Sequence, residues 1–66
     1  MFKTIAATYD SEATLSNVVD ELINDGLPRE KVFRDDKLML VKVMVPEASE
    51  SGIIEILKRH DPITIG

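Results

Sequence analysis

The sequence contains few side chains with the reactivity that catalysis or metal binding requires. His60 is the single histidine, and as a general base or metal ligand it would need a partner, but the nearest acid, Asp61, is only its neighbour in the chain. Asp35 and Asp36 are adjacent carboxylates without the further oxygen ligands of a calcium loop, so a polar turn is expected there. The serines fall where helices are expected to begin, which is the usual place for capping hydroxyls: Ser11, Ser16, Ser49 and Ser51. We therefore expect no catalytic residue, cofactor or metal, and we expect His60 to be a solvated cation at a helix end.

Two similar stretches of sequence organise the chain around these residues. Residues 11–26 align without a gap on residues 46–61. The aligned pairs keep size and polarity: Glu12 with Glu47, Ala13 with Ala48, Ser16 with Ser51, Val18 with Ile53, Val19 with Ile54, Asp20 with Glu55 and Leu22 with Leu57. Each stretch has apolar residues at helical spacing and lies between two runs typical of strands. The pattern predicts a strand, a helix and a strand, formed twice.

Local signals set the boundaries of the expected elements. They predict a strand over 2–9, a helix from Asp10-Ser11 to Gly26, a strand over 32–34, a turn at Asp35-Asp36, a strand over 37–45, a helix from about Glu47 to 58–60, and a strand over 63–65. The apolar stripes of the two helices are Leu15, Val18, Val19, Leu22 and Ile23 in the first and Ile53, Ile54 and Leu57 in the second. Glycine after the first helix and Pro46 before the second are the expected boundaries.

This order of elements is that of the α+β ferredoxin-like fold. Right-handed crossovers place the first and third strands side by side in the middle of an antiparallel sheet, which gives the spatial order 4-1-3-2. We expect residues 1–66 to form one such domain, with both helices on one face of the sheet and the other face uncovered.

The alternation of side chains predicts which residues of the third strand reach the core. Turning the charged Lys42 away from the helices leaves Leu38, Leu40 and Met44 on the uncovered face and sends the alternate set inward: Met39, Val41, Val43 and Val45. The first strand allows two orientations. Hydrophobicity directs Ile5, Ala7 and Tyr9 inward, whereas the gapless alignment matches them to the outward set of the third strand; we favour hydrophobicity.

Composition restricts the possible partners and the compartment. The 66 residues carry a net charge of -4, and the eight Lys and Arg residues are scattered, which argues against nucleic acid. The sequence has no cysteine, as expected for a cytoplasmic protein. The longest apolar run, 38–45, is interrupted by Lys42 and is too short to cross a bilayer, and no signal peptide is visible, so no membrane partner is expected.

Two segments together resemble a known family. They are KTIAATYDSEATLSNVVDELINDGLPREKV and LVKVMVPEASESGIIEILKRHDPITI, and they look like the small ferredoxin-like domains of bacterial general-stress or heat-induced-stress proteins. The features in common are the aromatic-Asp-Ser step at Tyr9, the Gly26-Leu27 helix end, and Leu-x-Arg-His at the end of the last helix. Members of that family often carry a Gly-rich apolar insertion where this chain has Asp35-Asp36. The resemblance implies the same fold and supplies no catalytic residues.

Other uses of this fold need residues that the chain lacks. Heavy-metal carriers use paired cysteines, acylphosphatase-like enzymes use a Gly-rich, Arg-bearing loop, and RNA-recognition domains use aromatics on the two central strands. We therefore expect a protein-interaction or regulatory module without catalysis, forming a homodimer or binding another protein. The residues expected at the interface are Phe2, Leu38, Leu40, Lys42 and Met44. The alternative is a small-ligand-sensing domain similar to ACT domains, with the ligand between subunits.

Overall fold

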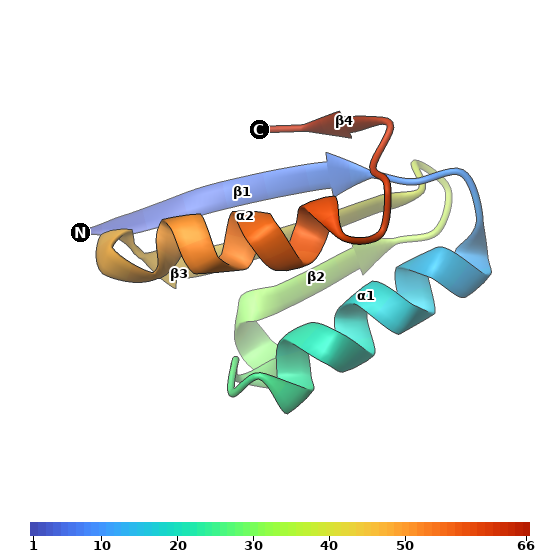
Figure 1. The fold of residues 1–66 in the computed structure, drawn as a ribbon. Helices are drawn as coiled ribbons and strands as arrows, with labels where there is room; N and C mark the ends of the chain where they lie inside the picture. Colours follow the sequence, from blue (N-terminus) through green and yellow to red (C-terminus); the bar gives the residue numbers. More distant parts are fainter.

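The first unit of the chain is a strand followed by a well-capped helix. In the computed structural model, which describes residues 1–66, strand β1 spans Phe2–Thr8 and helix α1 spans Glu12–Asn24 (Figure 1). The hydroxyl of Ser11 accepts a hydrogen bond from the backbone N–H of Thr14 at 3.2 Å. This bond satisfies one of the free donors in the first turn of α1, as expected for a capping serine.

The end of α1 depends on a glycine with a positive φ angle. Gly26 has φ 112°, and its N–H donates to the carbonyl of Ile23 at 3.0 Å. The N–H of Leu27 donates to the carbonyl of Leu22 at 3.2 Å. These two bonds form a Schellman motif, which ends the helix one turn before the proline at position 28.

Replacing the two helix-associated glycines, Gly26 and Gly52, by alanine should have opposite effects on stability. A Cβ at either Gly26 or Gly52 would meet no atom within 4 Å, so neither substitution causes a clash. We expect Gly26→Ala to destabilise the protein by about 1–2 kcal/mol, because alanine disfavours a left-handed backbone. We expect Gly52→Ala, inside helix α2, to stabilise it by about 0.5–1 kcal/mol. Urea unfolding of both variants checks the prediction, and a shift of the same sign in both would contradict it.

The middle of the chain is a hairpin closed by an aspartate side chain. A short 3-10 helix, Arg29–Lys31, leads into β2, Val32–Asp35, and β3 spans Leu40–Pro46. The carboxylate of Asp35 accepts the N–H groups of Lys37 and Leu38 at 3.0 and 3.1 Å, and Met39 has φ 53°. The prediction that β3 starts at residue 37 is therefore wrong, because this side chain holds residues 36–39 in a turn.

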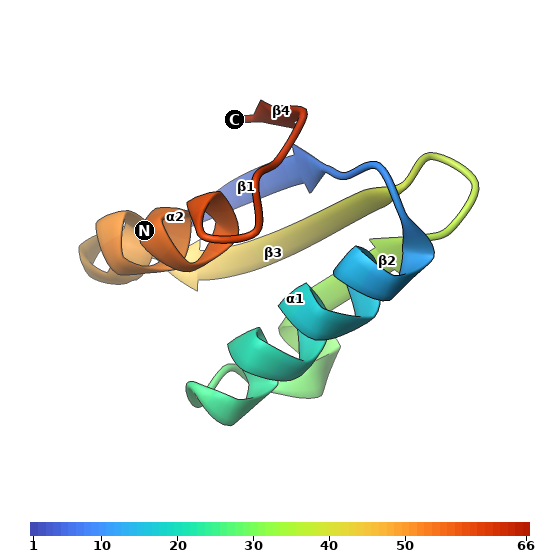
Figure 2. The ribbon, with the colours of Figure 1, turned by 45° about the vertical axis from the view of Figure 1, so that its right-hand side comes forward.

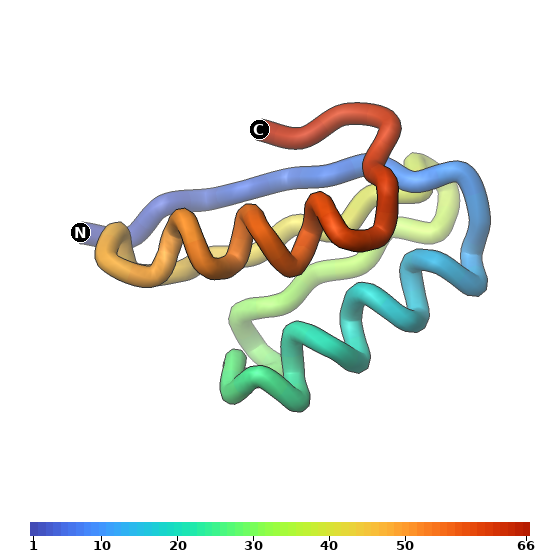
Figure 3. The backbone as a smooth tube through the Cα atoms, in the orientation of Figure 1, coloured from blue at the N-terminus to red at the C-terminus, as the bar shows by residue number.

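The second helix and the last strand complete the sheet. After a 3-10 turn, Glu47–Ser49, helix α2 spans Glu50–Lys58 and the last strand, β4, spans Thr64–Ile65. The order is β2-β3-β1-β4 and every pair is antiparallel, which confirms the predicted ferredoxin-like order read from the other edge. Figures 1 and 2 show both helices on the same face of the sheet, and Figure 3 shows the chain turning back after α2 to run beside β1.

A single apolar cluster lies between the sheet and the helices. Its twelve buried residues are Ile5, Ala7, Tyr9, Leu15, Val18, Leu22, Val41, Val43, Val45, Ile53, Ile56 and Leu57. The inward orientation of the first strand, favoured on hydrophobicity, is confirmed. In α2 the cluster takes Ile56 in full and Ile54 only in part, because Ile53, Ile56 and Leu57 are at positions i, i+3 and i+4 and share one face of the helix, which Ile54 only borders. Met39 also contributes only partly, since it belongs to the turn.

Candidate functional site

The face of the sheet that points away from the helices has no second layer. Because side chains alternate along a strand, the neighbours of the buried residues in β1 and β3 point to this side. The pairing of β2 and β4 with these strands extends the set. We call this surface the open sheet face, and it consists of Phe2, Thr4, Ala6, Thr8, Phe33, Asp35, Leu40, Lys42, Met44, Pro46 and Thr64.

Four of the five residues predicted at an interface belong to the open sheet face. Phe2 is on β1, and Leu40, Lys42 and Met44 follow one another at alternate positions of β3. The fifth, Leu38, was expected on the same strand but lies in the turn after β2, where it is 65% exposed. The structure therefore does not place Leu38 with the other four, because the Asp35 turn occupies its part of the chain.

Phe33 is a member of this face that the sequence reasoning did not identify. It lies opposite Lys42 in the pairing of β2 with β3, and it is 49% exposed. Directly opposed residues of an antiparallel pair point to the same face. Since Lys42 was already assigned outward, the register counted back from the turn would have assigned Phe33 outward as well.

The charges on the open sheet face are few and distributed unevenly. Lys42 is exposed and takes part in none of the ion pairs of the molecule. Asp35 is the only carboxylate on the face, and one of its oxygens holds the turn. These two residues, with Phe33, Arg34 and Leu40, line a shallow depression of about 360 Å³. At the other end of the face the ammonium of Lys31 lies 5.3 Å from the centre of the Phe2 ring, in cation–π contact.

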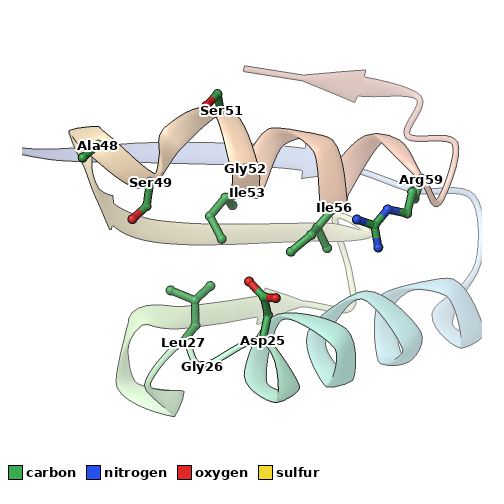
Figure 4. Close-up of a pocket in the computed structure, with 10 residues that line it drawn as sticks. All are labelled: Asp25, Gly26, Leu27, Ala48, Ser49, Ser51, Gly52, Ile53, Ile56 and Arg59. Atoms are coloured by element: carbon green, nitrogen blue, oxygen red, sulfur yellow. The ribbon is translucent and has the colours of Figure 1, made fainter.

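A groove of about 570 Å³ separates the end of α1 from α2. Figure 4 shows Leu27 and Asp25 on one side and Ile53 and Ile56 on the other, with small residues of α2 leaving the space open. Its volume is typical of small-molecule sites, which measure roughly 300–1,000 Å³. However, every buried residue of the molecule is apolar, so the groove offers no buried polar group to orient a ligand.

His60 lies at the end of α2 as predicted, but its side chain is paired with an acid rather than freely solvated. Its Nε2 lies 2.6 Å from one carboxylate oxygen of Glu21, and the guanidinium of Arg59 lies 2.5 Å from the other. The His60 side chain is 22% exposed. Glu21 is on α1, so this cluster connects the two helices. The sequence argument considered only the adjacent Asp61, whereas the fold supplies an acid from 39 residues away.

The remaining polar side chains serve the fold. Ser11 caps α1, and the hydroxyl of Ser16 accepts a hydrogen bond from Arg34 at 2.7 Å. Ser49 precedes α2 but its side chain makes no capping bond.

Tyr9 is buried, and its hydroxyl donates to the carbonyl of Leu57 at 2.8 Å. Burial raises the pKa of this phenol to about 12. No group of three or more His, Cys, Asp or Glu residues is placed to hold a metal ion.

Comparison with known proteins found no relative of the chain. No protein-family model, curated protein or solved structure matches the chain. The helices of the molecule are all too short or too polar to cross a membrane. The order of the strands defines the α+β ferredoxin-like class, and Phe2 and Phe33 are exposed on its open sheet face.

Proposed function

We propose that the chain is a small protein-interaction module that forms a homodimer through its open sheet face. The observation that carries the proposal is the exposure of large apolar side chains on a sheet that has helices on one side only: Phe2 is 55% and Phe33 49% exposed. An uncovered sheet face is normally polar, and an apolar one indicates a contact surface. A 66-residue domain also buries a small share of its surface alone, so association adds to its stability.

The charges of the face fit a two-fold arrangement. A two-fold axis lets one patch contact its own copy, which is the commonest symmetry of soluble oligomers. The open sheet face carries one base, Lys42, and one acid, Asp35. In a face-to-face dimer Lys42 of each copy can pair with Asp35 of the other, so both charges are matched in two equivalent contacts.

Two aspartates on β3 test the proposal. We expect the unmodified chain to be a dimer at micromolar concentration and the variant Leu40→Asp with Met44→Asp to be a folded monomer, because four unpaired carboxylates would have to be buried in the contact. Light scattering after size exclusion measures the mass, and circular dichroism checks the fold. The control is Ala13→Asp with Ser51→Asp, which adds the same charge at exposed helix positions and should leave the dimer intact. A monomeric unmodified chain, or a dimeric β3 variant, would refute the proposal.

The other expectations from the sequence belong to the same proposal and rest on the sequence alone. These are the absence of catalysis, the cytoplasmic location and the kinship with general-stress domains. The alternative function, a small-ligand-sensing domain similar to ACT domains, also stays a prediction. Thermal-shift measurements with amino acids and nucleotides separate it from a pure interaction module, because a ligand that binds only the folded state raises the melting temperature.

A further inference from the structure

The groove between the end of α1 and α2 stays open because the α2 side supplies little bulk there. The residues of α2 and its two caps that face α1 recur at helical spacing: Ser49, Gly52, Ile56 and Arg59. A Cβ at Gly52 would meet no atom within 4 Å, so nothing fills the groove at this position. Leu27 and Ile53 add apolar surface, and Figure 4 shows their side chains directed into the space between the two helices. An apolar group of side-chain size can therefore enter the groove.

Two charged groups of opposite sign lie at the rim of this apolar groove. Asp25 is the C-cap of α1, and its carboxylate points toward α2 and takes part in none of the ion pairs of the molecule (Figure 4). The guanidinium of Arg59 lies on the α2 side, next to Ile56. Glu21 accepts one hydrogen bond from Nη1 of Arg59. A guanidinium has five N–H donors, so others remain for a second acceptor.

We infer that this groove binds a free α-amino acid with a large apolar side chain. Its ammonium group pairs with Asp25, its carboxylate pairs with Arg59, and its side chain covers Leu27 and Ile53. These three features occur together on this class of small molecule. The interior of a peptide carries neither charge, a simple amine leaves Arg59 unmatched, and a simple carboxylic acid faces the carboxylate of Asp25. The volume of about 570 Å³ is in the range of small-molecule sites.

The position of the groove makes this site independent of the proposed homodimer. The groove is formed by the helices, which cover one face of the sheet, whereas the open sheet face is on the other side (Figures 1 and 2). All of its lining residues come from one chain, so the site is complete without a second copy. In the ACT-like alternative, by contrast, the ligand lies between subunits. The place where an amino acid binds therefore distinguishes the two sites.

Four small molecules test the inference in methyl NMR titrations of the unmodified chain. L-Leucine has all three features, isoamylamine lacks the carboxylate, 4-methylpentanoate lacks the ammonium group, and glycine lacks the side chain. We expect leucine to shift the methyl signals of Leu27, Ile53 and Ile56. Isoamylamine and 4-methylpentanoate should bind at least about threefold more weakly, because each loses one ion pair at the rim. Glycine should bind at least about tenfold more weakly, because it buries no apolar side chain.

Three results of these titrations would overturn the inference. The first is the absence of any shift at about 10 mM leucine, which would mean that no affinity even in the millimolar range exists. The second is equal binding of leucine and of an analogue that lacks one of the three features. The third is a set of shifts confined to the open sheet face, which would place the ligand at the proposed subunit contact.

Substitutions of the two rim charges test their roles. Asp25→Asn should weaken leucine binding at least about threefold, whereas Asp20→Asn, which removes the same charge from an exposed position of α1 outside the groove, should not. Arg59→Gln should weaken binding to a similar extent. It also breaks the ion pair with Glu21, so Glu21→Gln is its control: this variant breaks the same pair but keeps the guanidinium. An equal loss in Glu21→Gln and Arg59→Gln, or unchanged binding in Asp25→Asn, would overturn the assignment.

Gly52→Leu tests whether the ligand occupies the groove itself. Because the space at Gly52 is empty, a leucine side chain should fit there without unfolding the protein and fill the groove. We expect an unchanged or higher melting temperature and a loss of leucine binding of at least about tenfold. Unchanged binding in a folded Gly52→Leu variant would overturn the inference. The variant Leu40→Asp with Met44→Asp should bind leucine normally, so the proposed dimer and this site can fail separately.

Discussion

Leu57→Ala is expected to remove a large share of the protein's free energy of unfolding at 25 °C. The Leu57 side chain has no exposed surface and lies between α2 and the sheet. Removing three carbons from such a site costs about 2–5 kcal/mol, because the transfer energy is lost and a cavity remains. A domain of 66 residues has a total stability of roughly 3–10 kcal/mol at about 0.05–0.15 kcal/mol per residue, so the loss is a large share of it. Urea unfolding followed by circular dichroism gives the free energy.

Leu22→Ala should have the same effect, since the internal repeat places it at the equivalent position of α1 and it is also fully buried. Leu38→Ala is the matched control, because it removes the same atoms from a leucine that is 65% exposed in the turn. We expect its free energy of unfolding to change by no more than about 0.5 kcal/mol. If the control lowered stability as much as the two buried substitutions, the assignment of the core would be wrong.

The architecture was predictable because its signals are local and repeated. Helical spacing in residues 11–26 recurs in 46–61, and each stretch has a boundary with a physical cause: the Ser11 cap, the positive φ of Gly26, and Pro46. The crossover rule then restricts the strand orders open to a strand-helix-strand unit formed twice, and the ferredoxin-like order is the one in which the two units interleave. The orientation of β1 followed from hydrophobicity, since Ile5, Ala7 and Tyr9 form one apolar face of the strand.

Other features depend on contacts that periodicity does not report. The start of β3 is set by the Asp35 carboxylate, which binds two N–H groups and so prevents Leu38 from joining the strand. Phe33 is assigned to the open sheet face only through its register with Lys42. The bond between His60 and Glu21 requires the packing of one helix beside the other. The structure therefore places four of the five residues predicted at the interface on the open sheet face and Leu38 in a turn, and it adds Phe33 to that face.

Tyr9→Phe is expected to lower the free energy of unfolding by about 1–3 kcal/mol at neutral pH. The hydroxyl of Tyr9 donates to the carbonyl of Leu57 at 2.8 Å inside the core, and Tyr9 is 1% exposed. Phenylalanine keeps the ring and its packing but leaves that carbonyl of α2 without this donor. That carbonyl then keeps only the long hydrogen bond of 3.4 Å from the N–H of His60. A poorly satisfied polar group in the core retains part of its desolvation cost, so we expect the loss to exceed the net value of an average hydrogen bond.

The same tyrosine predicts how stability depends on alkaline pH. Burial raises its pKa from 10.0 to about 12 in the folded protein, so the unfolded chain releases this proton first. The stability that the protonated phenol contributes is fully present below pH 10 and is lost as the pH rises through 12. A shift of two pKa units corresponds to about 2.7 kcal/mol of this stability. Tyr9→Phe has no phenol to ionise, so its free energy of unfolding should not fall for this reason. The lysines are common to both proteins. The difference between the unfolding curves of Tyr9→Phe and of the unmodified chain between pH 9 and pH 12 therefore reports the phenol alone. Because Tyr9 is the only tyrosine, the absorbance of tyrosinate follows it directly. A midpoint near 10 in the folded protein would mean that the phenol is hydrated and that its bond to Leu57 does not hold α2 to the end of β1.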